Sequence, residues 1–204
     1  MTELRDGEEL SIEVPDGVET CLAYPPNAGA AAAACKSVDA TILATVLAPS
    51  AGRLVAAGAV RVDGVPAPLR FAVSFAPDSS AVEPTADTAR EFAAREVALR
   101  TSAPAPNEGG TPGAGSVDIL AVGGSPPAAA PTSGIVTAGG SRCVRATYTL
   151  DLRESGHDVP LHFATYGAWS RDGVYTFTVQ GDALHAAAAD SLADDAARTL
   201  MLKA

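Results

Sequence analysis

Three histidines are the side chains of this sequence best suited to acid–base or metal-binding chemistry at neutral pH. They are His157, His162 and His185, and no two of them have the spacing that directs two imidazoles at one zinc ion. We place His157 in a hinge, where a solvated histidine is the ordinary case. His162 alternates with Leu161 and Phe163, so we expect it to face solvent or a groove that could hold a small ligand. The pattern predicts no metal site and no cofactor, and it makes His162 a candidate binding residue.

No motif for nucleophilic hydrolysis or phosphate binding is complete in the sequence. The GxSxG pentapeptide that presents a catalytic serine does not occur. Its nearest approach, Gly139-Gly140-Ser141, is typical of a turn that leads into a strand. The glycine cluster at residues 109–116 lacks the lysine with which a phosphate loop reaches its ligand. We therefore expect a protein that is not an enzyme, and an enzyme with a scattered, unrecognised site stays open as an alternative.

The aromatic residues are concentrated in the C-terminal third of the chain, at Phe163, Tyr166, Trp169, Tyr175 and Phe177. Aromatics make up only 5% of this alanine-rich sequence, so most of this group should supply core burial. Tyr166 and Trp169 lie three residues apart in one predicted strand, and their side chains therefore belong to opposite faces. We expect one of the two to point away from the core and to anchor a binding surface, because Tyr and Trp are enriched at interface hot spots.

The three cysteines, Cys21, Cys35 and Cys143, are an odd number without a CxxC pair. The first residues lack a basic segment followed by an apolar one, so we expect reduced thiols and a cytoplasmic location. A disulfide between Cys21 and Cys35 stays open if the sequence is a trimmed mature form. Cys143 begins a predicted strand, where a small buried hydrophobe is expected.

The charge of the chain limits the partners that it can bind. The formal net charge is -10, and Lys36 and Lys203 are the only lysines. Binding to nucleic acid or to anionic lipid requires clustered Lys or Arg, so neither partner is expected. Solubility is the ordinary reason for such acidity, and recognition of a basic partner is the alternative. No apolar run reaches the roughly 20 residues of a membrane-spanning helix.

Alternation of apolar and polar residues predicts a series of short strands. Turn signals separate several of them, including Asp63-Gly64 and the residues 171–173. The predicted strands are residues 10–14, 18–22, 38–48, 54–62, 69–75, 117–122, 135–137, 144–152, 161–170 and 174–180.

Two segments instead have the helical period. Residues 85–100 begin at a cap that either Thr85 or Thr88 could provide, and Glu96 is placed on the wet face. Residues 182–202 begin at Asp182, and on their wet face Asp194 is expected to pair with Arg198. The predicted buried stripes are Ala89, Phe92, Ala93 and Val97 in the first helix, and Leu184, Ala188, Leu192, Ala196 and Leu200 in the second.

The order of these elements predicts the fold class. Strands followed by a helix, more strands and a final helix favour an α+β fold in which an antiparallel β-sheet is covered by two helices. The length of 204 residues fits a single domain over residues 1–204. Pro/Gly-rich excursions at 102–116 and 123–134 interrupt this domain as peripheral loops.

Two stretches of sequence carry a resemblance to a known superfamily. The segment LSIEVPDG near the N-terminus and the segments RATYTLDL and YGAWSRDGVYTFTVQ near the C-terminus resemble the PsbP-like fold. This fold is shared by photosystem extrinsic proteins, Ran-binding nuclear-import factors and bacterial DcrB-like proteins. The likeness covers residues 10–15 and 145–200, whereas residues 102–134 are longer and emptier than the family pattern.

The resemblance implies an α/β/α sandwich and a non-enzymatic role in binding another protein. Proteins of this superfamily act as assembly factors, import factors or chaperones of secreted effectors, and no shared catalytic motif defines them. The resemblance therefore carries over no active-site residue. A small-ligand carrier with a cavity between sheet and helix is the alternative function.

Overall fold

The computed structural model describes residues 2–6, 10–14, 19–22, 53–77, 84–101, 129–154 and 157–202. Several sequence predictions lie outside these residues. They are the strands at 38–48 and 117–122, the excursion at 102–116, most of the excursion at 123–134, and the pairing of Cys21 with Cys35.

The described strands form two antiparallel sheets. A three-stranded sheet has the order β1-β2-β10, and a seven-stranded sheet has the order β3-β4-β5-β9-β8-β7-β6. The strand bounds are β1 Thr2–Asp6, β2 Leu10–Val14, β3 Glu19–Leu22, β4 Arg53–Val60, β5 Leu69–Pro77, β6 Thr132–Ala138, β7 Ser141–Glu154, β8 His157–Trp169, β9 Gly173–Asp182 and β10 Met201–Leu202.

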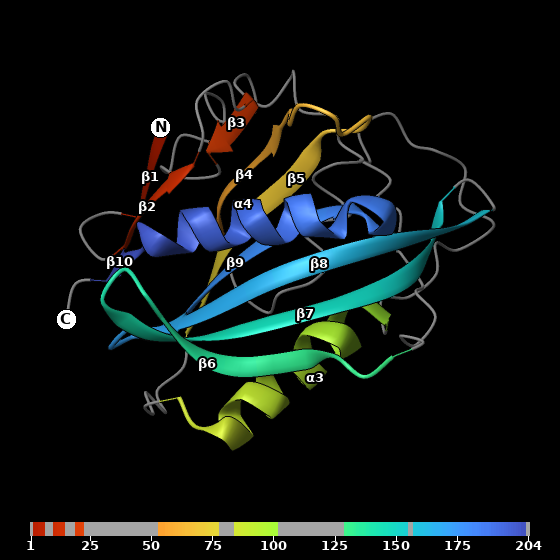
Figure 1. Cartoon of the computed structure of the whole chain (residues 1–204). Coiled ribbons are helices and arrows are strands. Elements are labelled where there is room, and N and C mark those ends of the chain that lie inside the picture. Colours follow the sequence, from red (N-terminus) through yellow and green to blue (C-terminus); the bar gives the residue numbers. More distant parts are fainter. Residues whose placement is uncertain are drawn as a thin grey trace, which may run out of the picture.

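Helices cover both faces of the large sheet, as Figure 1 shows. Helix α4 (Ala186–Arg198) packs against β8 and β9, and helix α3 (Ala86–Thr101) packs against β6 and β7 on the opposite face. This arrangement confirms the expected α+β class with an antiparallel sheet covered by two helices. Neither described helix is long and apolar enough to cross a membrane.

The core is divided between the two faces of the sheet. Under α4, Phe71 packs on Phe177 with ring centroids 6.2 Å apart, and the last helix adds mainly alanines. Under α3, Phe92 lies 6.0 Å from Trp169. Tyr148 and Phe163 stack at 5.2 Å on this same face. Large aromatic side chains therefore supply the burial that the alanine-rich helices cannot supply by themselves.

The C-terminal helix is shorter than the sequence predicted, although Leu192, Ala196 and Leu200 of its predicted stripe are buried. Asp182 accepts a hydrogen bond from the Leu184 N–H at 2.7 Å, but it caps a 3-10 turn, η2 (Ala183–His185), ahead of the α-helix. This turn rotates Leu184 out to 87% exposure, so its predicted place in the buried stripe is wrong. The buried residues of α4 are Ala189, Leu192, Ala193, Ala196 and Ala197. The helix ends at Arg198, and residues 201–202 form a strand with β2.

The predicted pair of Asp194 with Arg198 is also wrong. Arg198 pairs with Asp195 on the exposed side of α4, whereas Asp194 turns toward the sheet. The cause is the helical phase, because residues 194 and 195 differ by about 100° around the helix axis.

Helix α3 follows its predicted stripe with one important difference. Thr85 is the residue that caps it, since its hydroxyl accepts a hydrogen bond from the Thr88 N–H at 3.2 Å. Glu96 was placed on the wet face, but it is 4% exposed and forms a 2.8 Å ion pair with Arg100, which is 3% exposed. The helix therefore buries a charged pair against the sheet in addition to its apolar residues.

The connection from β6 to β7 is a Gly-Gly turn, as the sequence predicted. Gly139 and Gly140 have φ angles of +56° and +82°, which favour glycine at both positions. Strand β6 begins at Thr132, so the predicted excursion at 123–134 was extended too far at its C-terminal end.

Candidate functional site at the end of strand β6

Strand β7 is twice as long as its neighbour β6, and this difference leaves a step in the edge of the sheet. The β6–β7 pairing runs from Ala138 opposite Ser141 to Thr132 opposite Thr147. Strand β7 continues to Glu154 and pairs with β8 from Cys143 to Glu154. In the part of the chain that the structure describes, no strand pairs with the outer edge of residues 148–154, which we call the β7 edge.

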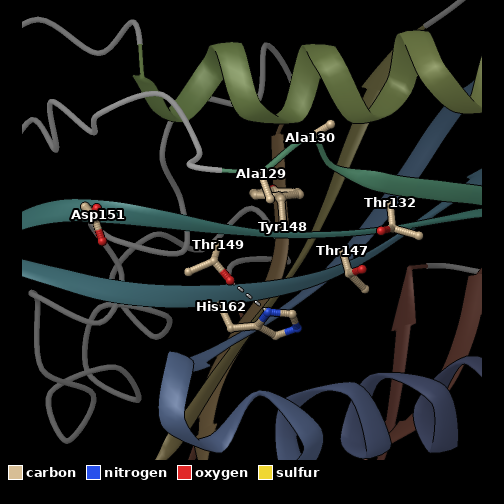
Figure 2. Close-up of a pocket in the computed structure, with 8 residues that line it drawn as sticks. All are labelled: Ala129, Ala130, Thr132, Thr147, Tyr148, Thr149, Asp151 and His162. Carbon is tan, nitrogen blue, oxygen red and sulfur yellow. Dashed lines mark hydrogen bonds between the residues drawn. The ribbon is translucent and has the colours of Figure 1, made fainter.

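A pocket of about 280 Å³ lies at this step. Figure 2 shows the residues that line it, which come from the start of β6, from β7 and from β8. They are Ala129, Ala130, Thr132, Thr147, Tyr148, Thr149, Asp151 and His162. We refer to this cavity as the His162 pocket.

The period of the strands decides which side chains share a face. Thr147, Thr149 and Asp151 alternate along β7, so they project on the same side of the sheet. Figure 2 shows Thr149 and His162 on the side that carries α4, and Tyr148 directed toward α3. The polar part of the His162 pocket is therefore built from one face of two paired strands.

His162 is 8% exposed, and each of its two ring nitrogens lies within hydrogen-bond distance of a polar side chain. Its Nε2 lies 3.0 Å from Asp190 Oδ1 on α4, and its Nδ1 lies 3.3 Å from Thr149 Oγ1 on β7. A carboxylate only accepts hydrogen bonds, so the neutral imidazole carries its proton on Nε2 and donates it to Asp190. Nδ1 then accepts a hydrogen bond from the Thr149 hydroxyl.

Two aspartates of α4 extend this network across the sheet. Arg145 on β7 contacts Asp190 at 3.3 Å and donates from Nε to Asp194 at 2.8 Å. The Tyr166 hydroxyl donates to the same Asp194 oxygen at 2.6 Å. Burial, together with the hydrogen bond to the Asp194 carboxylate, raises the pKa of Tyr166 well above its ordinary value. The network thus joins α4 to β7 and β8 through neutral hydroxyls and paired charges.

The structure places the three candidate residues in different environments. His162 lines the pocket and does not face open solvent. Tyr166 is buried, with its hydroxyl bound to α4, so it cannot serve as the outward member of its pair. Trp169 is partly buried and packs beside Phe92 of α3. The candidates therefore do not form one surface, and only His162 belongs to the pocket.

Sequence reasoning missed the partners of His162. Thr149 and Asp190 are separated from it by 13 and 28 residues, and no local motif connects them. Asp190 had no predicted role. Thr149 and His162 are cross-strand partners, and this pairing follows only from the register of β7 with β8. The alternation of polar residues along β7 was the one available signal.

The two polar contacts of His162 fix the orientation of its ring. A hydroxyl, an imidazole and a carboxylate in a row also occur in nucleophilic catalysis. Here the Asp190 carboxylate also contacts the Arg145 guanidinium at 3.3 Å. Within the described ranges, no group of three or more His, Cys, Asp or Glu side chains is placed to hold a metal ion.

Comparison with known proteins adds little beyond this description. No protein-family model matches the chain, and no curated protein matches it. One similar solved structure is the crystal structure of PA94 from Pseudomonas aeruginosa, described as a protein of unknown function and a candidate regulator. The match has 14% identity and a TM-score of 0.46, and it covers 100% of this chain and 98% of that one. Such a distant likeness supports no argument about function.

Within the described residues, the fold is an α+β arrangement in which a strand edge without a neighbour lies beside a partly polar pocket.

Proposed function

We propose that the protein is a non-enzymatic binding module that pairs an extended segment of a partner protein with the β7 edge. The observation that carries the proposal is the early end of β6, which leaves residues 148–154 of β7 without a described neighbour beside the His162 pocket. The resemblance of residues 145–200 to PsbP-like proteins supports the same role, as an accessory or chaperone-like protein.

Strand addition is the mode of recognition that this geometry favours. An unpaired strand edge presents a row of N–H and C=O groups that can bind the backbone of an incoming strand. The β7 edge spans residues 148–154, close to the usual strand length of about 5–6 residues. An incoming strand would continue the line of β6, and its backbone would supply affinity that does not depend on its sequence.

The pocket beside the edge would supply the specificity. In strand addition, alternate side chains of the bound segment enter pockets on one face of the sheet. The His162 pocket lies on such a face, directly beside Thr149 and Asp151 of β7. Edge and pocket together therefore provide the two components that this mode of recognition requires.

A small-ligand carrier is the second candidate, because the pocket itself favours it. Its volume of about 280 Å³ is at the lower limit of the roughly 300–1,000 Å³ of small-molecule sites. A cavity of this size suits one inserted side chain at least as well as a whole ligand. The pocket also lies at the step of the sheet edge, where a bound strand would cover it.

Two arginine substitutions test the proposal. Thr149 is exposed at the β7 edge, and Thr149→Arg places a bulky side chain in the His162 pocket, where it would collide with the facing side chain of an added strand. Thr137 is exposed on β6, away from the step, and Thr137→Arg is the matched control. With the protein as bait in its native lysate, we expect a bound protein that the Thr149→Arg variant loses and the Thr137→Arg variant retains.

The melting temperature separates blocked binding from unfolding. Thr137→Arg should melt within a few degrees of the wild type, since exposed substitutions usually change stability little. Thr149→Arg also removes the hydroxyl next to His162 Nδ1, so it should melt somewhat earlier. If Thr149→Arg melts early, Asp151→Arg gives a second block of the same edge, because Asp151 is also exposed there. Equal recovery of every partner by folded Thr149→Arg and Asp151→Arg proteins would refute binding at the β7 edge.

A further inference from the structure

We propose that the His162 pocket selects a lysine or arginine side chain of the bound segment, an inference that rests on the proposed strand addition at the β7 edge. The ligand is defined by its chemistry: a cationic, donor-only group on an extended peptide. Three independent features of the pocket point to it, namely its position relative to the edge, the polarity of its hydrogen-bonding groups and its charge.

The register of the sheet brings a side chain of the added strand to the pocket. Thr132 faces Thr147, and both line the pocket on the α4 side of the sheet. Because the side-chain period is two, residues of an added strand opposite Thr149 and Asp151 would project to this same side. One of these residues would therefore enter the His162 pocket.

The hydrogen bonds of His162 make the pocket wall an acceptor. In the neutral imidazole, the proton shared with Asp190 lies on Nε2, and Nδ1 then accepts the only proton of the Thr149 hydroxyl. The remaining lone pairs of Thr149 Oγ1 can then only accept hydrogen bonds. The hydroxyls of Thr132 and Thr147 can also accept, and a side chain that only donates satisfies all three without competition.

The charge at the pocket also favours a cationic ligand. Asp151 lines it with an exposed carboxylate, and no described residue forms an ion pair with this group. The neighbouring Asp190 is different, because Arg145 and His162 already occupy it. Asp151 is therefore the carboxylate available to a ligand, and the chain as a whole, with net charge -10, attracts cations.

Three peptides test this inference. They share the sequence Thr-Val-Thr-Xaa-Thr-Val-Thr with blocked ends, and Xaa is lysine, norleucine or glutamate. Backbone pairing is the same for all three, so differences in Kd report the pocket. NMR titration of the full chain to millimolar peptide should give about tenfold tighter binding for the lysine peptide than for the norleucine peptide, and weakest binding for the glutamate peptide.

Asp151→Asn is the variant that should remove the preference, since the amide keeps the shape of the side chain without its charge. Asp172→Asn removes another exposed carboxylate, from the turn between β8 and β9, and it should keep the preference. Loss of the lysine preference in Asp151→Asn but not in Asp172→Asn supports the inference.

The outcomes distinguish this inference from the proposed function. If all three peptides bind with equal Kd and shift the resonances of the β7 edge, strand addition stands and cation selection is wrong. If the lysine peptide binds best but shifts resonances elsewhere, or if no peptide binds at millimolar concentration, both are refuted.

Discussion

Glu96 and Arg100 show how a single pair of residues determines the environment beneath α3. Their ion pair is buried, and the Arg100 guanidinium lies 5.0 Å from the centroid of Phe163 and 5.7 Å from that of Tyr148. Burial raises the pKa of the Tyr148 hydroxyl, so it stays protonated in this setting. Arg100 is thus balanced by one carboxylate and by the faces of two rings.

Glu96→Gln should destabilise the protein by about 3–5 kcal/mol, because it leaves the buried Arg100 charge without its partner. Asp195→Asn is the matched control: it breaks the exposed pair with Arg198 and should cost well under about 1 kcal/mol. Urea unfolding measures both values. Similar small losses in the two variants would show that Arg100 finds water or another acceptor and that the pair is not effectively buried.

Cys143 connects residue burial to a pH dependence of stability. Burial is the main cause that raises the pKa of its thiol from 9.0 to about 11. The folded protein therefore holds this proton more tightly than the unfolded chain does. The thiol's contribution to stability is complete below about pH 9 and is lost as the pH rises toward about 11.

We therefore expect the difference in unfolding free energy between the wild type and Cys143→Ala to shrink between about pH 8 and about pH 11, by up to about 2 kcal/mol. The tyrosines titrate in both proteins, so the comparison cancels their effect. Urea unfolding at the two pH values measures it, and a difference that stays constant with pH would contradict the burial of the thiol.

Among the elements, helix α4 allows a direct test of the face through which it packs on the large sheet. Leu192 is 7% exposed and faces the sheet, whereas Leu184 in the preceding 3-10 turn faces solvent. Leu192→Asp should unfold or aggregate the protein, because a buried unpaired carboxylate costs several kcal/mol, a large part of a domain's stability. Leu184→Asp should change stability by less than about 0.5 kcal/mol. Circular dichroism melting curves of the two variants that coincide would show that α4 docks through another face.

The sequence predicted the elements whose apolar residues follow a clear local period. Alternation in β2, β5 and β9 and the helical stripe around Phe92 were sufficient to place these segments. The end of the last helix was not predictable locally, because residues 201–202 leave the helix to pair with Ser11 and Leu10, about 190 residues away. Leu184 was misplaced for a local reason: nothing in the sequence near Asp182 distinguishes a 3-10 turn from the first turn of an α-helix.

At the scale of the whole molecule, the candidate site is a product of register. His162 could be chosen from its alternation, but its contacts with Thr149 and Asp190 require β7, β8 and α4 to be assembled. The step between β6 and β7 could not be predicted from the sequence either. It depends on the position along the fourteen-residue strand β7 at which its seven-residue neighbour β6 ends. The open edge and its pocket therefore belong to the fold as a whole.

Amide hydrogen exchange shows whether an extended partner segment adds to the β7 edge. In an antiparallel strand, alternate N–H groups point to each neighbour, so those of residues 148–154 that do not bond β8 should slow when the partner segment binds. The amides of β3, at the other edge of the large sheet, serve as the internal control and should not change. We expect new protection in every second residue of 148–154 when the lysine peptide binds. Protection of β3 instead, or unchanged exchange throughout residues 148–154 at saturating peptide, would contradict it.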